Sequence, residues 1–161
     1  MIILRPMRND EYSGYLSYFI PDYAAEISRN FDMSEAQAFA RARQEISDDL
    51  PDGPNTDGEV LLTITDSALG SDVVIGYFWY RPDKTAHSAF ISDFHILPAY
   101  QGNGYGKGAL AALEATLSQA GFEQIRLRVA ADNARAHHLY DVVGFRTTGI
   151  NMSKRIGRPR S

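Results

Sequence analysis

Four glycines at alternate positions, in the stretch PAYQGNGYGKGAL (residues 98–110), stand directly before a leucine-striped helical pattern. A turn between a strand and a helix leaves backbone N–H groups without partners, and the helix dipole adds partial positive charge there. Glycines let the backbone adopt unusual dihedral angles and approach a ligand without Cβ atoms in the way. These residue types in this place predict a cradle for the pyrophosphate of a ligand.

Two common phosphate motifs fit this stretch poorly. A P-loop requires G-x-x-x-x-G-K-[S/T], but Gln101 stands where its first glycine belongs and Gly108 where its hydroxyl residue belongs. A dinucleotide pattern G-x-G-x-x-A can be traced from Gly104 to Ala109, with Glu123 about the right distance on. It follows a run of antiparallel-looking strands, and the next strand offers no clear ribose-binding carboxylate at its end. These two points count against the dinucleotide pattern. The alternative that it represents is an oxidoreductase, which would require NAD(H) binding.

The elements that must position this stretch alternate between strands and helices. The first helical pattern is interrupted at Pro21, and Ser34 and Gln37 form a capping box that opens the second. The third follows the glycines, and the fourth begins near Asp132 or Asn133 and ends at Gly144. This order predicts an α/β layer fold with a mixed sheet. The expected strands are residues 1–7, 59–65, 72–80, 86–96, 124–129 and 145–153.

The chain of 161 residues is expected to form one domain, residues 1–153, followed by a basic tail, residues 154–161. The absence of cysteine excludes disulfides and thiolate metal sites, and four scattered histidines give little support for any other metal site. A net charge of −4 argues against nonspecific nucleic-acid binding. No apolar run reaches the length of a membrane span, and no secretory signal is visible. We therefore expect a cytoplasmic protein without metal, nucleic-acid or membrane partners.

Two spaced motifs resemble those of the GNAT superfamily of N-acetyltransferases. QGNGYG resembles that family's acetyl-CoA pyrophosphate loop, R/Q-x-x-G-x-G/A, and NARAHHLYDVVGF (residues 133–145) resembles its second motif, N-x-x-A-x-x-L-Y-x-x-x-G-F. The first 60 residues are similar only in element order and look like a poorly characterised bacterial subgroup. The resemblance implies a GNAT-like mixed central sheet flanked by helices, with acetyl-CoA as cosubstrate. The free edge strands of such a sheet would favour a homodimer.

The resemblance also implies roles for individual residues. The acetyl group would pass directly to a primary amine of a small molecule, or to a protein N-terminus or lysine. Tyr140 would be the general acid for the CoA thiolate, and Asn133 would bind the pantetheine arm as well as capping its helix. The backbone of Phe94 and Ile96 would pair with pantetheine like an added strand. The residues implied for the pyrophosphate are Gln101, Gly102, Asn103, Gly104, Tyr105 and Gly106.

The base that removes the amine's proton does not follow from the resemblance. Many members place a glutamate where this chain has Arg128, and arginine stays protonated. Asp93 and His95 alternate onto one face of their strand. Asp93 could bind the amine or relay its proton through water, since a carboxylate recurs here in polyamine-acetylating relatives; it could also pair with Arg126 or Arg128. For His95 an ordinary hydrogen-bonded role is expected.

The alternative to an enzyme is a CoA-binding domain that senses or carries without catalysis. The glycine loop and Asn133 suit both functions, whereas Tyr140 and a base at Asp93 favour catalysis. An acceptor would lie against the first two helices, whose aromatic residues between Tyr12 and Tyr23 have the helical spacing typical of a core.

Overall fold

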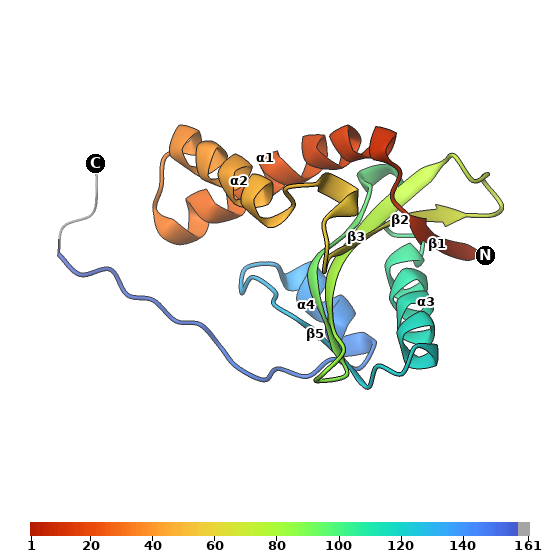
Figure 1. Ribbon diagram of the computed structural model, residues 1–161. Helices are drawn as coiled ribbons and strands as arrows, with labels where there is room; N and C mark the ends of the chain where they lie inside the picture. Colours follow the sequence, from red (N-terminus) through yellow and green to blue (C-terminus); the bar gives the residue numbers. More distant parts are fainter. Residues whose placement is uncertain (158–161) are drawn as a thin grey trace.

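The computed structural model describes residues 1–157, which form one five-stranded sheet with helices on both of its faces (Figure 1). The sheet order β1-β2-β3-β4-β5 follows the chain. The strands are β1 (Ile2–Pro6), β2 (Val60–Asp66), β3 (Val74–Asp83), β4 (Ser88–Ile96) and β5 (Gln124–Leu127). The helices are α1 (Tyr12–Phe31), α2 (Glu35–Asp49), α3 (Tyr105–Gln119) and α4 (Ala134–Val142), with short 3-10 turns η1 (Asn9–Glu11), η2 (Gly53–Asn55) and η3 (Pro98–Tyr100).

The sheet is mixed, as the sequence predicts. The pairs β1–β2, β2–β3 and β3–β4 are antiparallel, and β5 is parallel to β4 after the crossover through α3. Pairing between β4 and β5 covers only Ser88–Ile91 and Gln124–Leu127, although β4 continues to Ile96. The two strands therefore separate at the end of β4 that leads into the glycine stretch, and the candidate site lies at this opening.

Alternating side chains of the sheet build a core on each face. Tyr77 and Trp79 of β3 face α1 and α2, whereas Phe78 between them faces α3 and α4. On the α3 side, the predicted leucine stripe is buried against the sheet, and Phe78 stacks on Phe94 with ring centroids 4.4 Å apart. Asp93 pairs in register with Trp79, and its side chain therefore points to the α1 face.

The predicted interruption at Pro21 is wrong, because α1 runs unbroken from Tyr12 to Phe31. Pro21 is exposed, so the backbone hydrogen bond that it cannot donate lies on the solvent side of the helix. Phe19 before it and Ala24 and Ile27 after it are all buried on the inner face. Packing on both sides of the proline holds the helix together.

The predicted closing strand is also wrong, because residues 145–157 form no regular secondary structure. A strand requires a neighbouring strand for its backbone hydrogen bonds, and this segment has none within residues 1–157. The predicted basic tail begins inside the described residues with Lys154 and Arg155, whereas Arg158 and Arg160 lie outside them.

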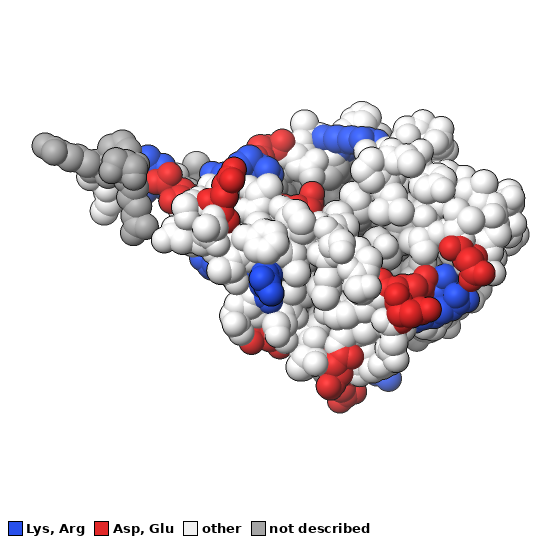
Figure 2. Space-filling view, turned by 90° about the horizontal axis from the view of Figure 1, so that it is seen from above, with Lys and Arg blue, Asp and Glu red and all other residues white. Residues whose placement is uncertain are grey.

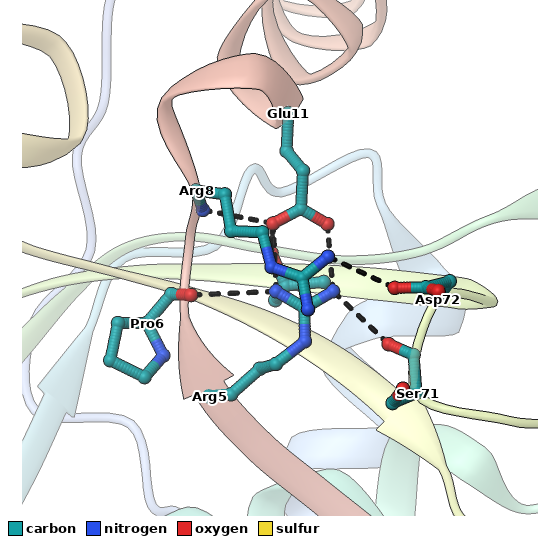
Figure 3. A network of polar contacts seen from close by, with 7 residues as sticks. Arg5, Pro6, Arg8, Glu11, Ser71 and Asp72 are labelled. Carbon is teal, nitrogen blue, oxygen red and sulfur yellow. Dashed lines mark hydrogen bonds and ion pairs between the residues drawn. The ribbon is translucent and has the colours of Figure 1, made fainter.

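A polar network fixes the start of α1 on the sheet (Figure 3). The Arg5 guanidinium pairs with both carboxylate oxygens of Glu11, at 2.7 and 2.8 Å, and donates to the Ser71 carbonyl at 3.2 Å. Glu11 also accepts from the Arg8 backbone N–H at 2.8 Å, while the Arg8 side chain reaches Asp72 at 2.9 Å. The bond from Arg5 is the main cause that lowers the pKa of Glu11 to about 2. The network joins β1, η1 and the loop before β3.

On the side of the molecule where α1 and α2 lie, the outer surface carries its charged residues in small groups separated by broad uncharged areas (Figure 2). This view shows no continuous basic band of the kind that binds nucleic acid. Among the helices of residues 1–157, none combines the length and the apolar composition that crossing a membrane requires.

Candidate active site

At the opening between β4 and β5, some backbone N–H and C=O groups of β4 point away from β3. The Leu97 N–H donates to the Ile75 carbonyl of β3 at 2.8 Å, so the backbone groups of Leu97 face β3. Because successive residues of a strand point to opposite sides, the N–H and C=O groups of Phe94 and Ile96 face away from β3. Beyond Ile91, β5 no longer pairs with this side. The N–H and C=O groups of Phe94 and the Ile96 N–H therefore pair with no described strand, and an extended ligand could lie against them; the Ile96 carbonyl accepts from the Gln101 side chain at 2.7 Å.

The glycine stretch forms an uncapped helix start beside this edge. Gly102 and Gly104 adopt φ of 83° and 79°, a conformation that favours glycine, and Gly104 is the N-cap of α3. No described side chain caps this helix. Its first intrahelical bond runs from the Gly108 N–H to the Gly104 carbonyl at 3.1 Å, so the N–H groups of the preceding turn have no helical partners. These groups and the helix dipole make an anion site.

Gly106 serves packing rather than an unusual backbone angle. A Cβ built on it would lie 3.2 Å from Leu139 Cδ2, so the missing side chain lets α3 and α4 approach closely. Near this contact, Arg135 of α4 donates to Gln101 Oε1 at 2.6 Å, and the Gln101 amide donates to the Ile96 carbonyl at 2.7 Å. These bonds connect α4, the loop and β4, and they place a guanidinium beside the predicted pyrophosphate site.

Tyr105 and Asn133 have structural roles that the structure shows directly. The Tyr105 hydroxyl donates to Asp66 at 2.8 Å and ties the start of α3 to β2. Backbone bonding from Ala68, the N-terminal ammonium and Tyr105 lower the pKa of Asp66 to about 2. Asn133 Oδ1 accepts from the Ala136 N–H at 3.1 Å, which confirms the predicted cap of α4. Asn103 is exposed in the loop.

Asp93 is held by two tyrosines of α1. The hydroxyl of Tyr15 donates to Asp93 Oδ2 at 2.8 Å, and the hydroxyl of Tyr18 donates to Oδ1 at 3.1 Å. Burial raises the pKa of Asp93 to about 7, an effect that the two donors oppose and that the carboxylates of Asp22 and Glu26 reinforce. Near neutral pH the carboxyl group therefore exists in both protonation states.

The arginine partners considered for Asp93 are not observed. Within residues 1–157, Arg126 and Arg128 make no ion pair with it, and Arg128 instead lies 3.8 Å from Glu26 across the opening. The predicted hydrogen-bonded role of His95 is not observed either, since its ring bonds to no other described residue. It stacks on Tyr18 with centroids 3.6 Å apart and planes within 7°, and burial lowers its pKa to about 4. His95 is therefore neutral at physiological pH.

Tyr140 approaches the same opening from α4. It is half-buried, with its ring against Phe145. Burial is the main cause that raises its pKa to about 12, and the charge of Asp93 adds to the effect. Tyr140 is therefore a neutral hydroxyl donor near a carboxyl group that titrates near pH 7. Two titrating groups with pKa values this far apart can act as acid and base in one reaction.

Sequence reasoning missed three side chains of this site. The sequence places Tyr15 and Tyr18 only in an aromatic stripe with the spacing of a core helix face. Two residues of this stripe, Tyr15 and Phe19, are indeed buried in the core. Their spacing on α1 gave no sign that two hydroxyls reach the same carboxylate. Arg135 stands at a variable position of the second motif, and only its contact with Gln101 reveals it. Residues 1–157 contain no cluster of His, Asp or Glu that could hold a metal ion.

Comparison with known proteins identifies the family. The sequence model of the Acetyltransferase (GNAT) family matches residues 28–145. The uncharacterized N-acetyltransferase YycN of Bacillus subtilis (strain 168) is 33% identical over 157 residues, covering 96% of this chain and 99% of YycN. The B. subtilis N-acetyltransferase YdgE, also uncharacterized, is 25% identical over 155 residues, covering 95% and 97% of the two chains.

Solved structures share the fold. The crystal structure of YycN superposes with a TM-score of 0.89 at 32% identity, covering 98% of this chain and 100% of that one. The PaiA N-acetyltransferase of Thermoplasma acidophilum, solved in complex with coenzyme A, superposes with a TM-score of 0.71 at 16% identity, covering 94% and 93%.

The chain belongs to the GNAT family of acetyltransferases. Its chemistry is acetyl transfer from acetyl-CoA, and the predicted GNAT-like fold is confirmed. The oxidoreductase alternative has no support in these similarities.

Proposed function

We propose that this acetyltransferase acts on a primary amine, of a small molecule or of a protein N-terminus or lysine, by direct attack on the thioester. The observations that carry the proposal are that two tyrosines hold the Asp93 carboxyl and that the charge of Asp93 helps to raise the pKa of the neutral Tyr140 hydroxyl. The name N-acetyltransferase given to YycN agrees with an amine acceptor.

Asp93 is the proposed general base. An amine attacks only in its neutral form, so a proton must leave the ammonium before or during the attack. With a pKa of about 7, Asp93 is partly ionised at neutral pH and can accept that proton directly or through one water. The bonds from Tyr15 and Tyr18 hold both of its oxygens in place and leave lone pairs free.

Tyr140 is the proposed general acid. Its pKa of about 12 keeps the hydroxyl protonated throughout the physiological range. It can therefore donate a proton to the sulfur of the departing thiolate, and then recover one from solvent. Asp93 gains a proton while Tyr140 gives one up, so the two groups have complementary roles.

Acetyl-CoA supplies the acetyl group in activated form, as a thioester. Its pyrophosphate would be held by the backbone N–H groups of Gly102–Gly106 and the first turn of α3, with the Gln101 side chain and the Arg135 guanidinium nearby. Its pantetheine arm would pair with the outward backbone groups of Phe94, with the Ile96 N–H and with Asn133. The uncapped helix start and the free edge of β4 are the features of this chain that fit such a ligand.

An amine panel with a readout of released CoA thiol tests the proposal. In the best acceptor reaction, Tyr140→Phe should lower kcat by about 10²- to 10⁴-fold, the usual contribution of a positioned acid. The thermal shift that acetyl-CoA produces should stay within about a degree of the wild type. Tyr23→Phe, the same change on the far side of α1 where the hydroxyl bonds to Glu45, should leave both unchanged. Full activity in Tyr140→Phe would show that this hydroxyl is not the acid.

A further inference from the structure

The hairpin between β3 and β4 extends the sheet beyond α1 and α2 (Figure 1). Near this end, Arg81 of β3, Phe90 of β4 and Arg126 of β5 form one row across the three strands, because Phe90 pairs in register with both arginines. Their neighbours in sequence pack into the core on the α3 face: Tyr80, Ala89, Ile91, Ile125 and Leu127. Since side chains alternate along a strand, the row itself points to the α1 face.

Phe90 is an exposed aromatic side chain on an inner strand. It is 40% exposed, although β4 has a neighbouring strand on both sides. Tyr77 and Trp79 lie on the same face of the sheet, and both are buried among residues of α1 and α2. The two helices therefore cover one end of this face and leave the end at the hairpin open, with an aromatic ring at its centre.

A cavity of about 360 Å³ lies on this open end of the sheet. It is called the hairpin site from here on. Its lining consists of the row and four residues of the hairpin: Pro82, Asp83, Lys84 and Ser88. Its volume is in the range of sites that bind small molecules. Neither Asp93 nor Tyr140 lines the hairpin site, so it is distinct from the candidate active site.

A buried carboxylate fixes the guanidinium of Arg81 at the hairpin site. The Glu59 side chain is only 6% exposed, and its Oε1 accepts from Arg81 Nε at 3.0 Å and from Arg81 Nη2 at 2.6 Å. The Trp79 indole N–H donates to the other oxygen of Glu59 at 3.4 Å. These bonds hold Arg81 in one orientation before any ligand arrives, and they connect the hairpin site to Trp79.

The charges of the hairpin site favour an anion. Within residues 1–157, Lys84 and Arg126 make no ion pair, whereas Arg81 is neutralised by its buried partner. The carboxylate in the lining belongs to Asp83, and its Oδ1 accepts from two backbone N–H groups of the hairpin turn at 3.1 and 3.0 Å. Two unpaired cations against one carboxylate leave the hairpin site with a positive charge, which attracts an anionic ligand.

Ser88 adds a buried hydroxyl to the hairpin site. The residue is 7% exposed and lines the cavity, and its hydroxyl makes no hydrogen bond within residues 1–157. Ser88 stands two positions before Phe90 and therefore lies on the same face of β4. Buried polar groups normally have a hydrogen-bond partner. This hydroxyl therefore indicates that the cavity takes a ligand with a polar group, next to the two unpaired cations.

We propose that the hairpin site binds a small aromatic carboxylate, in addition to the acetyl-CoA and acceptor sites of the transfer reaction. The aromatic ring of the ligand packs on Phe90. Its carboxylate accepts charge-assisted hydrogen bonds from Arg126 and Lys84 and a further bond from the Ser88 hydroxyl. The ligand thereby covers the exposed ring, pairs the two cations and supplies the partner that the buried hydroxyl lacks.

The single tryptophan reports on the hairpin site without any measurement of activity. Trp79 is the only tryptophan of the chain, and Glu59 connects it to Arg81. Its indole N–H resonance in the isotope-labelled full chain should therefore shift when benzoate is added. We expect a Kd of about 1 mM or tighter for benzoate. Acetate carries only the charge and benzyl alcohol only the ring, so each should bind at least about tenfold more weakly.

Substitutions locate the binding. Arg126→Gln should weaken benzoate binding about tenfold or more, because it removes a charged hydrogen-bond donor. The matched control is Arg43→Gln on α2, where another exposed arginine lies 6.0 Å from the ring of an exposed phenylalanine, Phe39, outside the hairpin site. It should leave the Kd unchanged, and saturating acetyl-CoA should not displace benzoate.

Three results would overturn the proposal. Acetate that binds as tightly as benzoate would reduce the effect to a nonspecific response to anions. A wild-type Kd in Arg126→Gln would place the ligand elsewhere, and displacement of benzoate by acetyl-CoA would place it in the acetyl-CoA site. A wild type that binds no benzoate would leave the hairpin site without the proposed ligand. None of these results bears on the roles proposed for Asp93 and Tyr140.

Discussion

Removing the Tyr18 hydroxyl should raise the pKa of Asp93. In the wild type this hydroxyl donates to Asp93 at 3.1 Å, and Tyr15 donates at 2.8 Å to the other oxygen. Both bonds favour the ionised carboxylate against the desolvation that holds its pKa near 7. Tyr18→Phe keeps the ring that stacks on His95 and removes only the donor.

The size of the effect follows from the strength of one hydrogen bond to a charged group. Such a bond contributes about 1.5–3 kcal/mol, and one pKa unit corresponds to about 1.36 kcal/mol. The pKa of Asp93 should therefore rise by about 1–2 units, from about 7 to about 8–9. At pH 7 the ionised fraction falls from about one half to between about a tenth and a hundredth. A rate that depends on the carboxylate should fall about 5- to 50-fold there and recover as the pH rises.

Carbon NMR of the labelled aspartate carboxyls measures this pKa without any acceptor, and Asp93→Asn identifies the resonance. The other groups around Asp93 are Tyr15, Asp22, Glu26, His95 and Tyr140. With pKa values of about 4 and about 12, His95 and Tyr140 do not titrate near neutral pH.

Tyr23→Phe is the matched control, because its hydroxyl lies on the same helix but bonds to Glu45 of α2. It should leave the Asp93 midpoint unchanged. If the midpoint in Tyr18→Phe equals that of the wild type, or lies below it, the reasoning that α1 tunes this carboxyl is wrong.

Three further substitutions, two of them with a matched control, have outcomes that follow from the structure. Glu11→Gln should lower the free energy of unfolding in urea by about 3 kcal/mol, because folding lowers the pKa of Glu11 from 4.5 to about 2. This stabilisation is present above the unfolded pKa and is lost as the pH falls toward 2. The control Asp72→Asn, in an exposed ion pair, should cost less than about 1 kcal/mol. Gly104→Ala and Gly58→Ala, both at φ of 79° in open space, should each cost about 1–2 kcal/mol, but only Gly104→Ala should weaken acetyl-CoA binding in calorimetry. Asp93 has a raised folded pKa, so its stabilising contribution is present below its unfolded pKa near 4 and is lost as the pH rises toward 7; Asp93→Asn should therefore flatten the melting temperature over that range.

Much of the fold could be predicted because its signals are local. The capping box of Ser34 and Gln37 and the cap at Asn133 depend on side chains within a few residues, and both form as expected. Pro21 misled because the packing of α1 on the sheet outweighs the preference of a single residue. The closing strand predicted at residues 145–153 was wrong for a related reason. Its alternating pattern is present, but a strand also needs a neighbouring strand, and the local pattern does not show whether one is available.

The candidate site was predictable where motifs mark it and unpredictable where distant elements meet. The glycine loop, Asn133 and Tyr140 stand in recognisable patterns, and the roles proposed for them in catalysis stay predictions. The tyrosines of α1 reach Asp93 across more than 70 residues of sequence, and their helical spacing is that of an ordinary core. Only the fold shows that burial and two hydroxyls act on one carboxyl group.

Comparing Asp93→Asn with the wild type, both saturated with acetyl-CoA, decides whether this carboxyl is the base. With the best amine as acceptor, the rate of CoA release should rise with pH in the wild type, with a midpoint near pH 7. Asp93→Asn should bind acetyl-CoA normally, lose that midpoint and be slower by about 10²- to 10⁴-fold. If it instead keeps the wild-type rate and the wild-type midpoint, another group or the solvent removes the proton, and the proposed mechanism is wrong.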